Sequence, residues 1–356
     1  MRIACCLFAL ALLLGASLTC PAAAQTETPR ILAFGDSITL GLREPGVDCF
    51  RPSTYRGYPA RLENRLAALG TDVDIDISAV CGEKTGEGLS RIGTDAVGYD
   101  VVLIMEGTND IASGRPIIGN PNILENLQMM AGKVLEAGAI PVYASVIPFG
   151  PTSPGSNGTN NRAGNLSRDL EDIAAAEGLP FVDTFGPIFS LPDYPRLYHS
   201  DGYHMLGEGN SIVADAFVGP TQEALALACD AGTPCEPSAT RMCLGDGRFS
   251  LELRWRTADG VSGDGQAVRI TEDTGRFWFF SPENLEVLVK VLDARCNNDH
   301  FWVFYGALTD VEYQMVVTDT QTCRRKVYAN PLGTFASAGD GFAFPAEPDP
   351  GSCGDG

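Results

Sequence analysis

The segment "ILAFGDSITLG" (Ile31–Gly41) is an apolar run that breaks at Gly35-Asp36-Ser37 and then resumes. Its first four residues, Ile31–Phe34, contain no polar alternation, which is typical of a strand in a parallel sheet that is covered on both faces. Ligands bind such sheets just beyond the carboxyl ends of the strands. We therefore expect Ser37 to lie at the edge of a sheet, where it is accessible for chemistry.

Alternating strands and helices are expected as far as residue 228. Further apolar runs lie at Val73–Ser78, Val101–Glu106, Ile140–Ile147 and Phe181–Thr184. Helical stretches are expected at Tyr58–Leu69, Ile123–Ala137, Ala163–Glu177 and Gly207–Leu227. This alternation predicts an α/β domain over residues 30–228, with a parallel sheet between two layers of helices.

The composition changes after this domain. Residues 229–240 are rich in small residues and proline and are expected to form a linker. "FSLELRWR" (Phe249–Arg256) then alternates strictly, as half-buried strands do, and similar runs follow. Residues 241–350 are therefore predicted to form an all-β, sandwich-like accessory module, with an irregular tail after Pro331.

The aromatic residues of this module admit two interpretations. They are Trp255, Trp278, Trp302, Phe277, Phe301 and Tyr305. Aromatic side chains in alternating strands usually form a sandwich core, and we favour that reading. Contact with a glycan or a surface through the module stays open as the alternative.

The first 24 residues indicate export. An apolar stretch, Leu7–Leu18, precedes Ala22-Ala23-Ala24, so a signal peptide cleaved near Ala24 and a secreted or periplasmic location are expected. The formal net charge of -20 argues against nucleic acid and anionic membrane surfaces as partners. No later segment is apolar for long enough to predict a membrane span.

Cysteine usage agrees with export. Outside the first 24 residues there are eight: Cys49, Cys81, Cys229, Cys235, Cys243, Cys296, Cys323 and Cys353. An even number in an exported chain predicts disulfides. In the module, local pairing favours Cys235–Cys243 and Cys296–Cys323. No C-x-x-C pair occurs and there are three histidines, so neither a zinc site nor another metal site is expected.

A nucleophilic serine needs a base and an acid that orients the base. His204 lies in "HSDGYHMLGEG" (His199–Gly209), three residues after Asp201 and directly before the last helix of the α/β domain. This spacing allows Asp201 to bind one imidazole nitrogen while the other faces Ser37. His199 is the closer rival and is expected to be a wall or surface residue, whereas His300 falls within the β module.

Acyl transfer also needs hydrogen-bond donors for the oxyanion of the tetrahedral intermediate. Gly82, in "SAVCGEKTG", follows the second expected strand and offers a backbone N–H. Asn109, in "MEGTNDI", follows the third and offers a side-chain amide. Asp36 and Asp110 are expected to be structural residues that hydrogen-bond their own loops.

The blocks "GDSIT", "CGEKT", "GTND" and "DGYH" resemble, in order and rough spacing, the SGNH or GDSL-type serine hydrolase superfamily. The resemblance covers residues 30–227. It implies a flavodoxin-like three-layer α/β/α fold without a cofactor. It also implies Ser37 as nucleophile, Asp201 and His204 as its partners, and an oxyanion hole of Gly82, Asn109 and the Ser37 N–H.

Among the branches of this superfamily, the chain looks most like the carbohydrate acetyl esterases. "YRGYPARLENRL" (Tyr55–Leu66) carries that likeness together with the first and third blocks. The expectation is a secreted serine esterase that deacetylates carbohydrate through an acyl-serine, with a small-molecule or polysaccharide ester as substrate. A lipase or lysophospholipase-type acyl hydrolase is the first alternative. A non-catalytic glycan-binding or adhesion protein is the second.

Two further expectations concern loops and the module. Arg43–Arg56 and Pro148–Asn161 are expected to shape the substrate pocket as loops. A Cys49–Cys81 disulfide would tie the first of them to the loop that carries Gly82. The C-terminal part resembles a β-rich module that recurs in secreted bacterial proteins.

Overall fold

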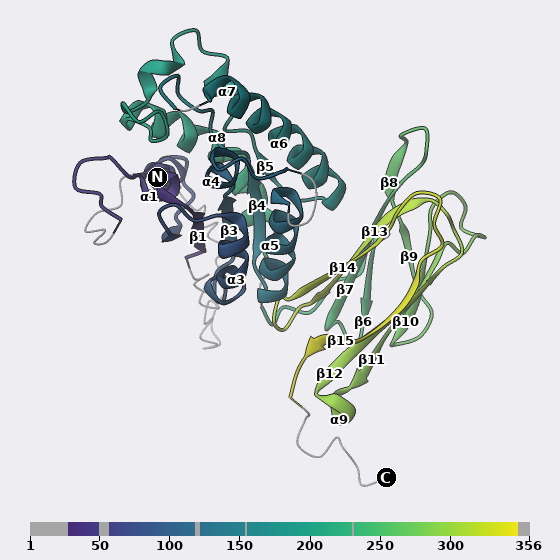
Figure 1. Cartoon of the computed structure of the whole chain (residues 1–356). Helices are drawn as coiled ribbons and strands as arrows, with labels where there is room; N and C mark the ends of the chain where they lie inside the picture. The colour runs from purple at the N-terminus through teal and green to yellow at the C-terminus, as the bar shows by residue number, and fades with distance from the viewer. Residues whose placement is uncertain (1–27, 50–56, 118–121, 154, 230, 348–356) are drawn as a thin grey trace, which may run out of the picture.

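A computed structural model describes residues 28–49, 57–117, 122–153, 155–229 and 231–347. The predicted signal peptide, residues 1–24, lies outside the described residues. An α/β part leads into a module of strands that lies beside it (Figure 1).

The α/β part is built on one parallel sheet. Its strands are β1 (Arg30–Gly35), β2 (Asp74–Ala79), β3 (Val101–Met105), β4 (Ile140–Ala144) and β5 (Phe181–Val182), in the spatial order β2-β1-β3-β4-β5. All four pairings are parallel. Gly35 pairs with both Ala79 and Met105, so the first three strands end at the same edge of the sheet. The five predicted strands are confirmed.

Helices cover both faces of this sheet. On one face lie α2 (Tyr58–Ala68) and α8 (Gly207–Leu227), and on the other α3 (Thr85–Asp95), α5 (Ile123–Ala137) and α6 (Ser156–Glu177). Alternate side chains of β1 enter the two cores, Ile31 and Ala33 on the first face and Leu32 and Phe34 on the second. The fold is the predicted flavodoxin-like α/β/α arrangement.

Two helical features differ from expectation. Helix α3 was not predicted, because it contains three glycines, which are poor helix formers. Gly88 explains one of them: a Cβ there would lie 3.2 Å from the ring of Phe34 and 3.0 Å from Met130, so glycine lets α3 pack closely. Helix α6 begins at Ser156, so the expected loop Pro148–Asn161 ends in a helix.

Four short helices complete the α/β part. They are α1 (Ser37–Leu40), α4 (Thr108–Ala112), α7 (Gly186–Phe189) and the 3₁₀ helix η1 (Tyr194–Leu197). Both α1 and α4 begin within three residues of a strand end, at the edge where the predicted site residues lie. None of the four helices was predicted.

The module contains two antiparallel sheets that share one core. The first has the order β15-β12-β11-β10-β9, and the second β14-β13-β7-β6 with β8 paired to β7. The bounds are β6 (Arg241–Leu244), β7 (Phe249–Arg256), β8 (Ser262–Asp264), β9 (Gln266–Arg269), β10 (Thr274–Trp278), β11 (Val287–Ala294), β12 (His300–Ala307), β13 (Glu312–Asp319), β14 (Arg325–Asn330) and β15 (Ser337–Pro345), with a short helix α9 (Arg295–Asn298). Phe249 of the second sheet packs against Phe301 of the first, with ring centroids 4.9 Å apart in the shared core, so the sandwich-like, all-β prediction is confirmed.

The expectation of an irregular tail after Pro331 is wrong, because β15 pairs with β12 there. The strand was missed because it contains glycines, and the structure shows why glycine is needed at these positions. A Cβ on Gly339 would lie 2.7 Å from the ring of Phe304 on the neighbouring strand. The ring of Trp302 lies beside Gly341 in the same way, 3.8 Å from the position of an added Cβ.

The expected Cys296–Cys323 pairing is also wrong. Cys323 lies in the turn between β13 and β14 and forms a disulfide with Cys229 of the linker, while Cys296 is disulfide-bonded elsewhere. The hairpin of β13 and β14 places Cys323 next to the linker, so the disulfide forms with Cys229 although Cys296 is closer in the sequence. The Cys235–Cys243 disulfide is present as expected.

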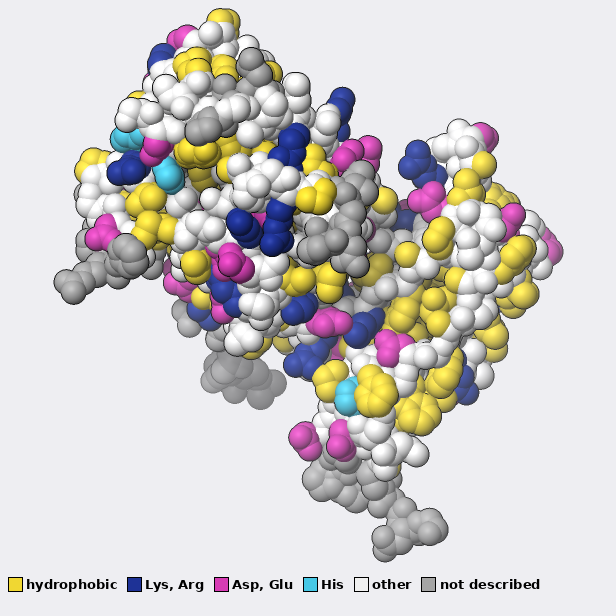
Figure 2. All heavy atoms as spheres, viewed as in Figure 1, with side chains coloured by type: hydrophobic (Ala, Val, Ile, Leu, Met, Phe, Trp, Pro, Cys, Tyr) yellow, Lys and Arg dark blue, Asp and Glu magenta, His cyan; other side chains and the backbone are white. Residues whose placement is uncertain are grey.

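Contacts from β14 join the module to the α/β part. The Lys326 ammonium pairs with Glu136 of α5 at 2.8 Å, and Arg325 donates to the carbonyl of Leu227 at the end of α8. Hydrophobic side chains gather on the visible face of the module, whereas charges of both signs cover the α/β part (Figure 2). Within the described ranges, no helix is both long and apolar enough to cross a membrane.

Candidate active site

The turn after β1 presents Ser37. A Cβ at Gly35 would lie 2.2 Å from the Thr39 hydroxyl and 2.6 Å from the Met105 carbonyl, so only glycine allows the chain to turn here. The Asp36 carboxylate then caps α1 by accepting from the Ile38 N–H at 2.8 Å. Ser37 becomes the first residue of α1 and lies at the edge of the sheet.

The structure brings Ser37, His204 and Asp201 together. His204 Nε2 lies 2.9 Å from the Ser37 hydroxyl oxygen, and His204 Nδ1 lies 2.9 Å from an Asp201 carboxylate oxygen. A carboxylate can only accept, so the imidazole proton belongs on Nδ1 and Nε2 accepts from the serine hydroxyl. The arrangement suits Nε2 to remove the serine proton.

Asp201 is held in its ionised form. Burial acts to raise its pKa, but donation from the His204 ring and from the backbone N–H groups of Tyr203 and His204 lowers the pKa below its usual value. Arg43 Nε also donates to this carboxylate at 3.2 Å. Asp201 can therefore stabilise a positive charge on His204 near neutral pH.

The other two histidines lie away from this chain of hydrogen bonds. The backbone of His199 donates to the His204 carbonyl at 2.9 Å and so fixes the turn. His300 is in β12, and its Nδ1 lies 2.6 Å from the Asn298 carbonyl oxygen. Of the three candidate bases, His204 is the one that contacts Ser37.

Two backbone donors are available beside Ser37. Within the described residues, the N–H groups of Ser37 and Gly82 donate to no protein acceptor. Gly82 has a φ of 77°, in the left-handed region that favours glycine. Both residues follow strands that end at the same edge of the sheet.

Asn109 is engaged, whereas the sequence suggested a free donor. Its amide nitrogen donates to Asp36 Oδ2 and to the Glu83 carbonyl, each at 2.9 Å. These two bonds fix the amide between the turn after β1 and the loop after β2. An oxyanion contact from Asn109 therefore requires one amide hydrogen to be shared between two acceptors.

A group of buried acids surrounds these donors, and sequence reasoning missed two of its members, Glu83 and Glu106. Asp36, Glu83, Glu106 and Asp110 are all buried, and burial raises the pKa of Asp36 to about 7. Asp110 accepts from the backbone and the hydroxyl of Thr85, so it binds the start of α3 and not, as expected, its own loop. The signal that could have revealed the group is the presence of an acidic residue directly after two neighbouring strands, Asp36 after β1 and Glu106 after β3.

A disulfide lies beside the Gly82 loop. Cys49 and Cys81 are bonded, with Cα atoms 5.8 Å apart, and Cys81 immediately precedes Gly82. Residues 50–56 of the expected pocket loop Arg43–Arg56 lie outside the described residues.

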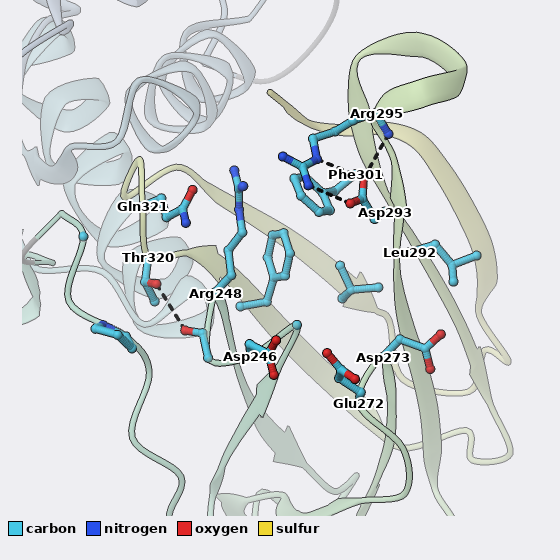
Figure 3. Close-up of a pocket in the computed structure, with 16 residues that line it drawn as sticks. Asp246, Arg248, Glu272, Asp273, Leu292, Asp293, Arg295, Phe301, Thr320 and Gln321 are labelled. Carbon is cyan, nitrogen blue, oxygen red and sulfur yellow. Dashed lines mark hydrogen bonds and ion pairs between the residues drawn. The ribbon is translucent and has the colours of Figure 1, made fainter. Parts of the chain in front are cut away.

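A hollow of about 610 Å³ lies in the module and not at Ser37 (Figure 3). Arg248 and Arg295 flank the ring of Phe301 at 4.2 and 4.9 Å, and they pair with Asp319 and Asp293. Because these charges are paired with each other, the stack of Arg248, Phe301 and Arg295 serves the structure of the module.

Comparisons with known proteins identify a family for the α/β part. A model of the GDSL-like Lipase/Acylhydrolase family matches residues 33–212, which include Ser37, Gly82, Asn109, Asp201 and His204. The chain is also 30% identical over 123 residues to an arylesterase of Vibrio mimicus. That match covers 34% of this chain and 56% of the arylesterase, so this chain spans little more than half of that relative.

Solved structures with a similar fold include a lipase/acylhydrolase of Enterococcus faecalis, with 22% identity and a TM-score of 0.46 over 56% of this chain and 97% of that one. An acetyl xylan esterase of Geobacillus stearothermophilus has 24% identity and a TM-score of 0.40, over 54% and 95%. Because both TM-scores are below 0.5, the assignment to a family rests on the family model.

Proposed function

Because this chain belongs to the GDSL-like lipase/acylhydrolase family, we propose that it is a secreted serine esterase that deacetylates carbohydrate. In this proposal Ser37 is the nucleophile, His204 the general base and acid, and Asp201 the residue that orients His204. Ser37 N–H, Gly82 N–H and Asn109 form the oxyanion hole.

One observation carries the proposal: two consecutive 2.9 Å hydrogen-bonding distances link Ser37, His204 and Asp201. A base within hydrogen-bonding distance of the nucleophile, itself oriented by a third group, is the geometry that activates a serine. The unpaired N–H groups of Ser37 and Gly82 add donors at the same edge.

The reaction follows from these positions. His204 Nε2 takes the hydroxyl proton as the Ser37 oxygen attacks the ester carbonyl carbon, and the donors stabilise the oxyanion. The alcohol leaves with the proton from Nε2, which gives an acyl-serine. Water then loses a proton to Nε2 and attacks the acyl carbon; the acid departs and the proton returns to Ser37.

Export is supported by the disulfides of the described chain, which form in oxidising compartments. Carbohydrate as substrate is supported by the likeness of the sequence blocks to carbohydrate acetyl esterases. The rim beside the triad also carries the exposed guanidinium of Arg43, which suits a polar ligand better than an acyl chain.

The test is a panel of esters. We expect turnover of p-nitrophenyl acetate and release of acetate from acetylated xylan, with lower kcat/KM for long-chain p-nitrophenyl esters. Ser37→Ala should lower kcat by about 10⁴-fold or more. Ser190→Ala, a serine outside the proposed catalytic group, should retain the activity.

The alternatives give other results on the same panel. A strong preference for long acyl chains would replace the carbohydrate esterase with a lipid acyl hydrolase. No turnover, together with no covalent labelling by a fluorophosphonate probe, would favour a non-catalytic glycan-binding protein.

Glycan contact through the module is the last part of the proposal. Phe277 and Phe301 are buried in its core, which fits the structural reading of the aromatics. Phe304 and Phe342 on the opposite face are 39% and 69% exposed. Retardation of the protein by xylan in affinity electrophoresis, reduced in Phe342→Ala, would support glycan contact there, and equal mobility with and without xylan would remove it.

A further inference from the structure

Glu106 is the most unusual buried group at this site. It directly follows β3 and is 0% exposed. Among the described residues, neither oxygen of its carboxyl accepts a hydrogen bond from an N–H or O–H donor. A buried carboxylate without partners is strongly destabilised, so its surroundings must supply either a counter-charge or a proton.

The surroundings of Glu106 are mainly acidic. Its carboxyl lies within hydrogen-bonding reach of the Glu83 side chain, and it faces the charges of Asp36 and Arg91. Arg91 is already occupied, because its Nε and Nη2 bind the two oxygens of Glu83 and its Nη1 binds Asp95. The counter-charge therefore belongs to Glu83.

Two ionised carboxylates cannot hydrogen-bond to each other, because both only accept. A proton on one of the two carboxyl groups allows that group to donate a hydrogen bond to the other. Since Glu83 is paired with Arg91, the proton belongs on Glu106. Burial, followed by the charges of Asp36 and Glu83, raises the pKa of Glu106 well above its usual value, and the nearby Arg91 lowers it by less.

Resting on the proposed function, we infer that Glu106 is a neutral carboxylic acid that donates to the Glu83 carboxylate and thereby positions the oxyanion donors. Glu83 immediately follows Gly82, and its carbonyl accepts from the Asn109 amide at 2.9 Å. Fixing the Glu83 side chain from both Arg91 and Glu106 fixes the loop that presents the Gly82 N–H and that anchors the Asn109 amide of α4. Glu106 is thus a positioning residue and does not touch the substrate.

A metal ion is not needed to explain this acidic group. In the part of the chain that the structure describes, no set of three or more His, Cys, Asp or Glu side chains could hold one. A shared proton accounts for the contact between Glu106 and Glu83 without any added ligand.

The first experiment detects the proton. Infrared difference spectra of the full-length protein at pH 7.5, wild type minus Glu106→Gln, should contain the carbonyl band of a protonated carboxylic acid. Glu286→Gln serves as the matched control, because Glu286 is a buried carboxyl in the module that accepts from Asn284 at 2.7 Å. Absence of the band in the Glu106 difference spectrum would overturn the inference.

The second experiment measures positioning. Glu106→Gln retains a neutral donor toward Glu83, so its kcat on p-nitrophenyl acetate should stay within about threefold of wild type. Glu106→Leu removes the donor, so its kcat should fall by about 10–100-fold with little change in KM, because misplaced catalytic groups lose rate. Equal losses in the two variants, or none in Glu106→Leu, would remove the positioning role.

The two proposals can fail separately. The infrared band does not depend on turnover, so it tests the proton even if the wild-type protein hydrolyses no ester. If Glu106→Leu does not fold, Glu106→Gln still decides: wild-type kcat supports the donor role, and a 10-fold or larger loss contradicts it. Covalent labelling of Ser37 by a fluorophosphonate probe reports on the proposed function alone.

Discussion

The α/β part and the β module treat buried charge in opposite ways. In the module, Asp319 is 0% exposed and binds Arg248 through two hydrogen bonds of 3.1 and 2.8 Å. At the sheet edge of the α/β part, Glu106 is equally buried, and its carboxyl oxygens accept no hydrogen bond from a donor within the described residues. The paired charges of the module stabilise its fold, whereas the neighbouring buried acids beside Ser37 lower the stability of the α/β part. We infer that the buried charges of the module serve its structure and that those of the α/β part serve the site at Ser37.

The largest effect on activity is expected from a substitution that removes a charge from the α/β part. Asp201→Asn leaves the shape of the side chain intact but allows the wrong imidazole tautomer, so kcat should fall by about 10³–10⁴-fold. Stopped-flow or steady-state hydrolysis of p-nitrophenyl acetate measures it. Asp193→Asn, at an exposed carboxylate paired with Arg196, is the matched control and should keep the wild-type rate. A loss of less than tenfold in Asp201→Asn would contradict the assigned role.

The second change breaks the charge arrangement of the module. Arg248→Leu leaves Asp319 buried and unpaired, so the free energy of unfolding should fall by about 3–5 kcal/mol. Arg241→Leu removes an exposed pair with Glu252 and should cost at most about 1 kcal/mol. Urea unfolding compares the two variants, and both should keep the wild-type kcat in the folded state. Similar stabilities for the two variants would show that the buried pair is not the stronger one.

The third change compares disulfides in the two regions. Replacing Cys49 and Cys81 with serine opens a link between positions 32 residues apart and should cost about 3–4 kcal/mol. Replacing Cys235 and Cys243, 8 residues apart, should cost about 2–3 kcal/mol. Thermal and urea unfolding measure both losses. Only the first pair should also lower kcat, because Cys81 adjoins Gly82; an equal effect on kcat from both pairs would argue against that coupling.

The smallest effect, taken per pH unit, is a dependence of stability on pH. The pKa values of Asp36 and Glu106 are raised by burial, so their favourable contributions are complete below the usual carboxyl pKa values of 3.8 and 4.5. These contributions are lost as the pH rises, through about 7 for Asp36. Between pH 5 and 8 the free energy of unfolding should fall by at most about 1.4 kcal/mol per pH unit for each proton released.

The module should respond in the opposite direction. Hydrogen bonds from Arg295 lower the pKa of Asp293, so its contribution is present above the usual carboxyl pKa and is lost as the pH falls. Urea unfolding of wild type and Glu106→Gln between pH 5 and 8 measures the response of the α/β part, because the contribution of Asp293 is constant above its usual pKa of 3.8. The Glu106→Gln variant should show the shallower slope, and identical slopes would contradict the account of Glu106.

The strands of the sheet could be predicted from the sequence, because short, continuous apolar runs between helical segments are typical of buried parallel strands. The site residues Ser37, Gly82, Asn109, Asp201 and His204 could be nominated for a related reason. Each follows a strand or precedes a helix, and parallel strands bring such positions to one edge. The acid, base and nucleophile types then limited the possible chemistry, although their assignment to roles stays a proposal.

Glycine misled the prediction in both regions. Helix α3 and strand β15 were missed because Gly88 and Gly339 weaken the local preference for regular structure. In each case a neighbouring aromatic ring occupies the space of the missing side chain. That ring comes from a distant part of the sequence, so no local pattern could reveal it.

Local sequence was enough for the order of strands and helices, the switch to an all-β module and the residue types that gather at one edge. These follow from hydrophobic periodicity and from chain connectivity, which act over a few residues at a time. Three features needed the folded chain: the pairing of Cys229 with Cys323, the engagement of Asn109 by Asp36 and Glu83, and the burial of Glu106 without a described donor to its oxygens. Each depends on groups from separate elements sharing one small volume, where burial and charge act through space.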